Sequence, residues 1–395
     1  MISHALNSAP LAGIKVLDLT RLLPGPMASL HLADLGAEVI KIEDTGAGDY
    51  ARGMGAGAAR GQDSLFFRMI NRNKKSLRLD LKQAEGVAVF MRLVKDADIV
   101  LEGFRPGVTE KLGVGYATVS DVNPRIVYGS ITGYGQDGPW AERAGHDINY
   151  IATSGVLDQI ASAGGAPAIP NLQIGDLLGG ALTPLVAVLA AVIGARVSGR
   201  GCHVDVAMTD AVFAHAVFPL VTTLMQGKPI PGGEDLLTGG FPAYSVYKTA
   251  DGRFMAVGAL EPKFWHELCR AIERNDLAPH GLAMGEKGAW ARHELATLFA
   301  GQSLAHWSAL FADIDCCVTP VLRMDEAMDH PQLQARGMLQ EVGGMQQFSP
   351  PFKFSGWQPA PPTSSPPTGG NSDTILRSAG YSDDEITGLR DRRVI

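Results

Sequence analysis

Two side chains in the middle of the chain have types and surroundings that suit the movement of a proton. His146 lies in Gly145-His146-Asp147-Ile148-Asn149-Tyr150, and Asp176 lies in Ile174-Gly175-Asp176-Leu177-Leu178-Gly179-Gly180. Each stretch leads into an apolar run, so the sequence predicts two loops that each precede a helix. An imidazole and a carboxylate that face each other across a pocket can remove a proton from one face of a carbon and return it to the other.

Each of these residues also has an ordinary structural interpretation. Histidine side chains in water have a pKa of about 6.5, which suits proton transfer, but a histidine in a Gly-His-Asp turn often only binds its own loop. Asp176 would act as an acid and base only if burial or a neighbouring charge raised the pKa of its carboxyl group. By position alone it is a helix N-cap, with glycines that allow close backbone approach and N–H groups available for an oxyanion.

Glu261 is a third candidate for the site. A carboxylate can hold an imidazole in one tautomer, as the third member of a catalytic triad does. Glu261 stands directly before Pro262, however, and a carboxylate at the start of a helix needs no catalytic explanation. Asp147 is a further carboxylate next to the proposed base.

Composition and charge restrict the classes of function. The chain has 395 residues, which predicts two domains, and its 34 basic and 41 acidic residues give a net charge of −7. This charge argues against a nucleic-acid binder. The four cysteines include no Cys-x-x-Cys pair, which predicts reduced thiols in a cytoplasmic protein and no metal site. The apolar run 181–195 is shorter than the roughly 20 residues of a membrane span, so no membrane partner is expected.

The elements that must position these residues alternate between strand and helix. Such alternation predicts an α/β fold, a large Rossmann-like domain built on a parallel sheet. The expected strands are 14–19, 38–42, 97–102, 125–131 and 203–207, and the expected helices are 27–35, after a break at Pro24-Gly25-Pro26, 83–94, 176–197 and 209–224.

A change in composition after the last of these helices predicts a second domain. The stretch 227–240 is rich in proline and glycine, and strands at 243–249 and 253–257 would form a hairpin. We therefore expect a large domain over 1–226 and a smaller α+β domain over 227–336. The proline-rich segment 337–395 is too polar to form a core of its own, so it should return to the large domain.

Basic residues are concentrated in two places. Arg72, Lys74, Lys75 and Arg78 lie in the stretch 71–80, which we interpret as a connection, and Arg105 follows an expected strand. Lys75 and Arg105, at strand ends, are candidates for binding phosphate, although solvated surface charges would look the same. The glycine-rich stretch 53–61 lacks the G-x-G-x-x-G spacing, so we interpret it as a mobile loop and not a dinucleotide site.

Several stretches together are similar to the class III CoA-transferase superfamily. The similarity is carried by 11–20, 24–26, 34–43, 71–75, 104–107, 132–139, 199–201 and 380–386. It implies an acyl-CoA thioester substrate, with CoA as part of the substrate and no separate cofactor, and an interlocked homodimer. The residues that it suggests for binding substrate are Lys41, Asn73, Lys74, Lys75, Arg105, Gly145, Asp147 and Tyr150, with Lys41 in place of an arginine that this chain replaces by Asp44.

The superfamily contains two kinds of enzyme, and both place an aspartate where Asp176 stands. His146, Glu261 and the stretch 317–322 resemble the α-methylacyl-CoA racemase branch, in which aspartate and histidine exchange a proton with the substrate. The Asp-Asp-Glu-Ile sequence at 383–386 resembles the transferases, in which the aspartate is a nucleophile. Three hypotheses follow: a racemase acting through an enolate, a CoA-transferase, and a non-catalytic acyl-CoA-binding protein.

Overall fold

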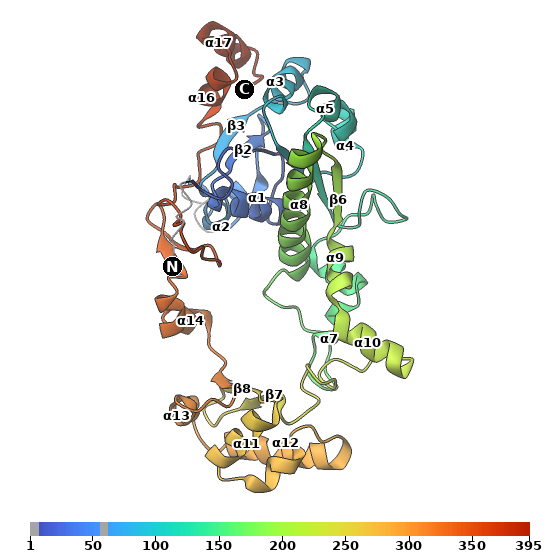
Figure 1. Ribbon diagram of the computed structural model, residues 1–395, viewed down its shortest axis with the longest axis vertical. Coiled ribbons are helices and arrows are strands. Elements are labelled where there is room, and N and C mark those ends of the chain that lie inside the picture. The colour runs from blue at the N-terminus through green and yellow to red at the C-terminus, as the bar shows by residue number, and fades with distance from the viewer. Residues whose placement is uncertain (1–7, 56–61) are drawn as a thin grey trace. The chain divides into compact units, whose positions relative to one another are not determined.

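The computed structural model describes residues 8–55 and 62–395, which form two compact units (Figure 1). Unit 1 comprises the described parts of Met1–Ser154, Leu172–His215 and Gln334–Ile395. Unit 2 comprises Gly155–Asn171 and Ala216–Leu333. Each unit is therefore assembled from separate stretches of the chain.

Unit 1 is built on a six-stranded parallel sheet, as the alternation of strands and helices predicted. Its strand order is β3-β2-β1-β4-β5-β6, so the order reverses between β1 and β4, where open α/β sheets bind ligands at the carboxyl ends of their strands. The strands are β1 (Lys15–Asp18), β2 (Glu38–Glu43), β3 (Lys75–Arg78), β4 (Ile99–Glu102), β5 (Val127–Thr132) and β6 (His203–Ala207).

Alternate side chains of the strands point to two separate cores. Leu17 belongs to a core covered by α3 (Ala84–Val94), α5 (Tyr116–Val122), α16 (Ser372–Ser378) and α17 (Asp383–Asp391). Val16 belongs to the opposite core, covered by α1 (Pro24–Asp34) and α8 (Thr183–Ser198). The remaining helices of unit 1 are η1 (Tyr50–Gly53), α2 (Leu65–Ile70), α4 (Val108–Lys111), α6 (Asp147–Thr153), η3 (Gly175–Leu182) and α9 (Met208–His215).

Two predictions for the first part of unit 1 were wrong. Pro24-Gly25-Pro26 does not break the chain but forms the first turn of α1, where proline loses no hydrogen bond because the first N–H groups of a helix have no partner. The stretch 71–80 is not a basic connection, since Lys75–Arg78 forms the edge strand β3, with Leu77 and Leu79 buried in the core.

Two predictions for the central helices also require correction. The expected helix 209–224 is two helices, α9 and α10 (Val217–Gln226), with a break at Ala216. The apolar run that seemed too short for a membrane span belongs to a continuous helical run, Gly175–Ser198, of 24 residues, which is long and apolar enough for one. One face of its α8 part lies on the sheet, where Val188 packs against Gly129 of β5.

Unit 2 is a small α+β unit with an antiparallel sheet in the order β7-β8-β9. It begins earlier than residue 227, because α10 and the stretch 155–171 both belong to it. Gln159 donates to the Ile230 carbonyl (3.3 Å), which ties the earlier stretch to the later one. Its elements are β7 (Tyr244–Lys248), β8 (Phe254–Gly258), β9 (Val318–Pro320), α7 (Val156–Gln159), α11 (Pro262–Ala271), η4 (Asn275–His280), α12 (Gly285–Phe299), α13 (Leu304–Phe311), α14 (Met324–Met328) and α15 (Pro331–Ala335).

The segment after unit 2 returns to unit 1 and covers the outer edge of β3. It begins at Gln334, slightly before the expected 337, and contains the short hairpin β10 (Leu339–Glu341) and β11 (Gln346–Phe348). The side-chain oxygen of Asn371 accepts the Ser76 N–H (3.0 Å), and the Asp80 N–H donates to the Val394 carbonyl (2.8 Å). These bonds satisfy backbone groups that an edge strand would otherwise expose.

Candidate active site

His146 is held at the start of α6 by its own loop. Its N–H donates to the side-chain oxygen of Asn149 (3.0 Å), and its imidazole is exposed. The buried Tyr150 anchors the loop by donating from its hydroxyl to the Gly145 carbonyl (2.6 Å). A Cβ atom on Gly145 would lie 2.7 Å from the Tyr150 ring, and one on Gly133 would lie 2.4 Å from it. Gly133 directly follows β5, so the loop with His146 lies at the carboxyl edge of the sheet.

Asp176 lies in the first turn of a π-helix, η3, whose N-cap is Ile174. The expectation that Asp176 itself would be the N-cap was therefore wrong. The glycines that follow are needed for packing, since a Cβ on Gly179 would lie 2.8 Å from the Met208 backbone and one on Gly180 would lie 2.3 Å from Pro24. Single π-helical turns are rare and are frequent at functional sites.

A hydrogen bond brings the two predicted loops together. The backbone N–H of Asp176 donates to a carboxylate oxygen of Asp147 (3.1 Å), the residue next to His146. Burial, with the negative charge of Asp147 as the smaller cause, raises the pKa of the Asp176 carboxyl group to about 7. A raised pKa is the condition under which Asp176 could both accept and donate a proton near neutral pH. The same bond occupies the Asp176 N–H, which is consequently not available to an oxyanion.

Glu261 lies in unit 2, as the N-cap of α11. Its carboxylate is exposed and makes no hydrogen bond within the described part of the chain. Glu261 and His146 thus belong to different units, and the pairing of the two side chains stays a prediction.

A hollow of about 860 Å³ opens at the carboxyl ends of β1, β2 and β4, where the order of the strands in the sheet reverses. Arg105 lines it, as does Arg21, a residue that the sequence analysis missed. The Arg21 guanidinium lies 4.9 Å from the ring centres of both Tyr50 and Phe104. Its position directly after a strand is the same signal that identified Arg105.

Two of the lysines predicted to bind substrate are buried and already bonded. The Lys41 ammonium contacts Asp49 (2.7 Å) and the Thr20 carbonyl (2.9 Å). The Lys74 ammonium donates to the Pro26 carbonyl and the Asn71 side chain (both 2.8 Å), and burial lowers its pKa to about 7. Neither side chain is exposed to solvent, so both are wrong as direct phosphate contacts.

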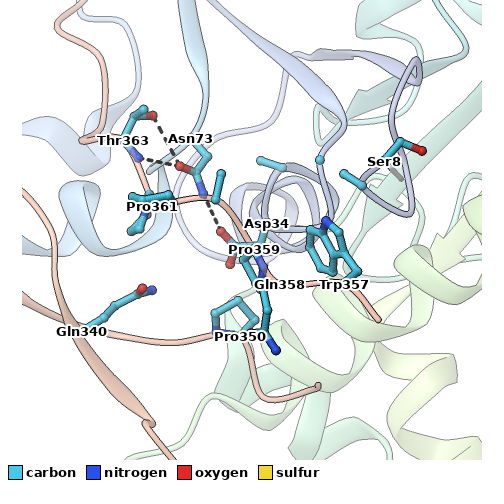
Figure 2. A pocket seen from close by; sticks show the side chains of 15 residues that line it. Ser8, Asp34, Asn73, Gln340, Pro350, Trp357, Gln358, Pro359, Pro361 and Thr363 are labelled. Carbon is cyan, nitrogen blue, oxygen red and sulfur yellow. Dashed lines mark hydrogen bonds between the residues drawn. The ribbon is translucent and has the colours of Figure 1, made fainter. Parts of the chain in front are cut away.

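Lys75 and Asn73 also differ from expectation. Lys75 is the first residue of β3 and pairs with Glu38 (2.5 Å) at the amino edge of the sheet, opposite the edge with Arg105, so these two cations do not form one phosphate site. Asn73 donates to Asp34 (2.9 Å) and accepts from the Thr363 N–H (2.7 Å), which fastens the C-terminal segment beside a cavity of about 540 Å³ (Figure 2). The structure thus groups Gly145, Asp147 and Tyr150 with the proposed acid and base.

The chain is similar to known proteins over most of its length. Residues 11–372 match the model of CoA-transferase family III. The chain is 36% identical over 391 residues to Alpha-methylacyl-CoA racemase of Mus musculus, covering 98% of this chain and 97% of that protein. It is 30% identical over 392 residues to Succinyl-CoA:glutarate CoA-transferase of Homo sapiens, covering 97% and 89% respectively.

Solved structures agree with the sequence relatives. A CAIB/BAIF family protein from Brucella suis superposes with a TM-score of 0.83 at 27% identity, covering 94% of this chain and 100% of that one. Both racemases and transferases are among the sequence relatives. The match over most of its length shows that this chain belongs to CoA-transferase family III.

Proposed function

We propose that this protein is a racemase that interconverts (2R)- and (2S)-2-methylacyl-CoA thioesters. The observation that carries the proposal is the Asp176 carboxyl group, whose pKa of about 7 lets it both hold and release a proton near neutral pH. A hydrogen bond from its backbone joins it to the loop of His146, a second proton carrier. The 36% identity to a racemase supports the same reading.

The reaction requires two proton transfers at one carbon. Either His146 or Asp176 removes the α-proton, and the electron pair of the broken C–H bond moves onto the thioester oxygen to give an enolate. The other residue then donates a proton to the opposite face of the same carbon, and the carbonyl forms again. Nothing is oxidised or reduced, and each residue ends in the protonation state in which the other began.

The rest of the substrate can be assigned by charge and size. We place the phosphates of CoA in the hollow at the carboxyl edge of the sheet, where Arg21 and Arg105 supply cations. Its volume of about 860 Å³ is within the usual range for ligand pockets. We also propose that Glu261, whose carboxylate has no hydrogen-bond partner in the described part of the chain, orients an active-site imidazole once the subunits assemble.

The subunits are proposed to form a homodimer, and α8 supports this. Val186, Ile193 and Val197 lie along one face of this helix and are 68%, 67% and 86% exposed. Because the opposite face already packs on the sheet, α8 is apolar all round, and a helix of that kind is normally buried. A second subunit would cover the outer face.

A CoA-transferase is the second candidate. It is favoured by the 30% identity to Succinyl-CoA:glutarate CoA-transferase, which covers nearly the whole chain. In that reaction the Asp176 carboxylate would attack the thioester carbonyl and displace CoA, and His146 would have no part in the chemistry.

Deuterium exchange separates the two reactions. The purified protein is incubated in D₂O with a 2-methylacyl-CoA and no acceptor acid, and the α-hydrogen is followed by NMR. The racemase proposal expects the α-hydrogen to be replaced by deuterium, and expects His146→Ala and Asp176→Ala to reduce the rate by at least about a hundredfold, the usual contribution of a general acid or base. A fixed α-hydrogen, together with CoA transfer once a second carboxylic acid is added, would establish the transferase instead.

A further inference from the structure

Unit 2 contains a cavity of about 820 Å³ that the proposed reaction does not use. It lies between the sheet of β7, β8 and β9 and the residues that surround that sheet. Its walls combine apolar side chains (Leu237, Val246, Val257) with hydroxyl groups (Tyr244, Ser245, Thr319). A cavity of this size can hold a small organic ligand.

Arg292 of α12 lines this cavity and differs from every other arginine of unit 2. The others all form ion pairs: Arg253 with Glu326, Arg270 with Glu267, Arg274 with Asp276 and Glu294, and Arg323 with Asp325 and Glu326. Arg292 forms none within the described residues, and no aspartate or glutamate is among the residues that line the cavity. Its one hydrogen bond goes from Nη1 to the Gly240 carbonyl (2.5 Å).

This arrangement leaves most of a cation unsatisfied. A guanidinium group has five N–H donors in a planar fork, and the Gly240 carbonyl takes only one of them. The side chain is half-buried, and removing a charge from water without a counter-charge is unfavourable. In a chain with a net charge of −7, a half-buried arginine in an acid-free cavity fits an anion that comes from a ligand.

The cavity indicates which anion this is. One planar guanidinium matches the two oxygens of one carboxylate, and such bidentate pairs are among the strongest hydrogen bonds in proteins. The hydroxyl of Tyr244 makes no hydrogen bond in the described part of the chain and can donate to the same group. Leu237, Val246 and Val257 would contact carbon atoms, so the ligand has an apolar stretch that ends in a carboxylate.

We propose that this cavity is a binding site for a small organic carboxylate with an apolar chain, and that Arg292 holds the carboxylate.

Calorimetric binding to the full-length protein tests this site. The probes are alkanoic acids of increasing chain length, each compared with its neutral methyl ester. At the chain length that fits, the acid should bind about tenfold more tightly than the ester, as expected for a charge-assisted pair. Arg292→Met should remove this preference and leave the affinity for the ester unchanged, while Arg292→Lys should keep part of it.

Arg270→Met is the matched control, because it removes the same charge from an exposed position in unit 2. It should leave the preference intact. The site is disproved if no chain length favours the acid or if Arg292→Met still does. Because binding needs no turnover, this result does not depend on the reaction proposed above.

Discussion

The Asp147 carboxylate acts on Asp176 in two ways. It accepts the Asp176 N–H and so fixes the start of η3, and its charge adds to the effect of burial in raising the pKa of the Asp176 carboxyl group to about 7. These roles are separable, because an amide oxygen accepts a hydrogen bond as a carboxylate does but has no charge.

Asp147→Asn is accordingly expected to preserve the fold and lower the pKa of Asp176. The rate of α-proton exchange, measured against pH, should then fall at a lower pH on its acidic side, because Asp176 stays ionised further into acid. Asp121→Asn, on exposed residue 121 of α5, is the control and should leave the profile unchanged. If the acidic side of the Asp147→Asn profile coincides with that of the unmodified protein, Asp147 does not tune the acid.

The Asp147→Asn substitution should also change how the stability of the fold depends on pH. Because the folded-state pKa of Asp176 lies above the ordinary aspartate value of 3.8, the folded state binds this proton more tightly than the unfolded state. Its contribution to stability is complete below pH 3.8 and is lost as pH rises toward 7. Asp147→Asn should therefore reduce the loss of stability between pH 4 and pH 8, by about 1 kcal/mol for this half-buried group.

At the scale of elements, a segment can be predicted from the sequence when its buried side chains form a recognisable apolar pattern. β1, β2, β4 and β5 are apolar runs and were predicted within two residues. β3 was missed because Lys75 and Arg78 flank its buried residues, and a charged edge strand looks like a connection. The π-helical form of η3 has no sequence pattern of its own, since it results from the packing of Gly179 and Gly180 against Met208 and Pro24.

The candidate site was predictable to a similar extent. Residue types suggested His146 and Asp176 as a catalytic pair, which stays a prediction, and the structure joins their loops. Lys41 and Lys74 could not be excluded as ligands by sequence, because counting charges does not show which ammonium groups are buried against Asp49 and Asp18. Arg292 carries no signal in the sequence, because a lone arginine in a helical pattern cannot be interpreted until its neighbours in space are known.

Two glycines in the run from η3 to α8 test the packing account. Gly180→Ala places a methyl group 2.3 Å from Pro24, so it should destabilise the protein by about 1–3 kcal/mol and also slow exchange, because η3 carries Asp176. Gly194→Ala in α8 meets no atom within 4 Å and should stabilise by about 0.5–1 kcal/mol, as alanine suits a helix better than glycine. Equal thermal unfolding of the two variants would contradict this explanation.

At the scale of the whole molecule, the exposed face of α8 predicts the assembly. Replacing both Ile193 and Val197 by aspartate should convert the proposed homodimer into monomers, as measured by sedimentation velocity, because two charges would be buried without partners. Val122→Asp is the control, since Val122 is exposed on α5, which covers the other face of the sheet. A double variant that sediments like the unmodified protein would contradict the assignment of this face of α8 as the dimer interface.

The bonds between β3 and the C-terminal segment have a consequence for biosynthesis. The residues that bond to β3 and to the residues flanking it, from Thr363 to Val394, follow unit 2 in the chain and are synthesised after it. On the ribosome, β3 is complete after about eighty residues, but nearly three hundred more must be synthesised before the segment that covers it exists. At typical elongation rates this takes about 15–60 s. During that interval the nascent chain exposes a strand edge that can pair with other chains, so a translational stall before Asn371 would yield an aggregation-prone product from an otherwise correct sequence.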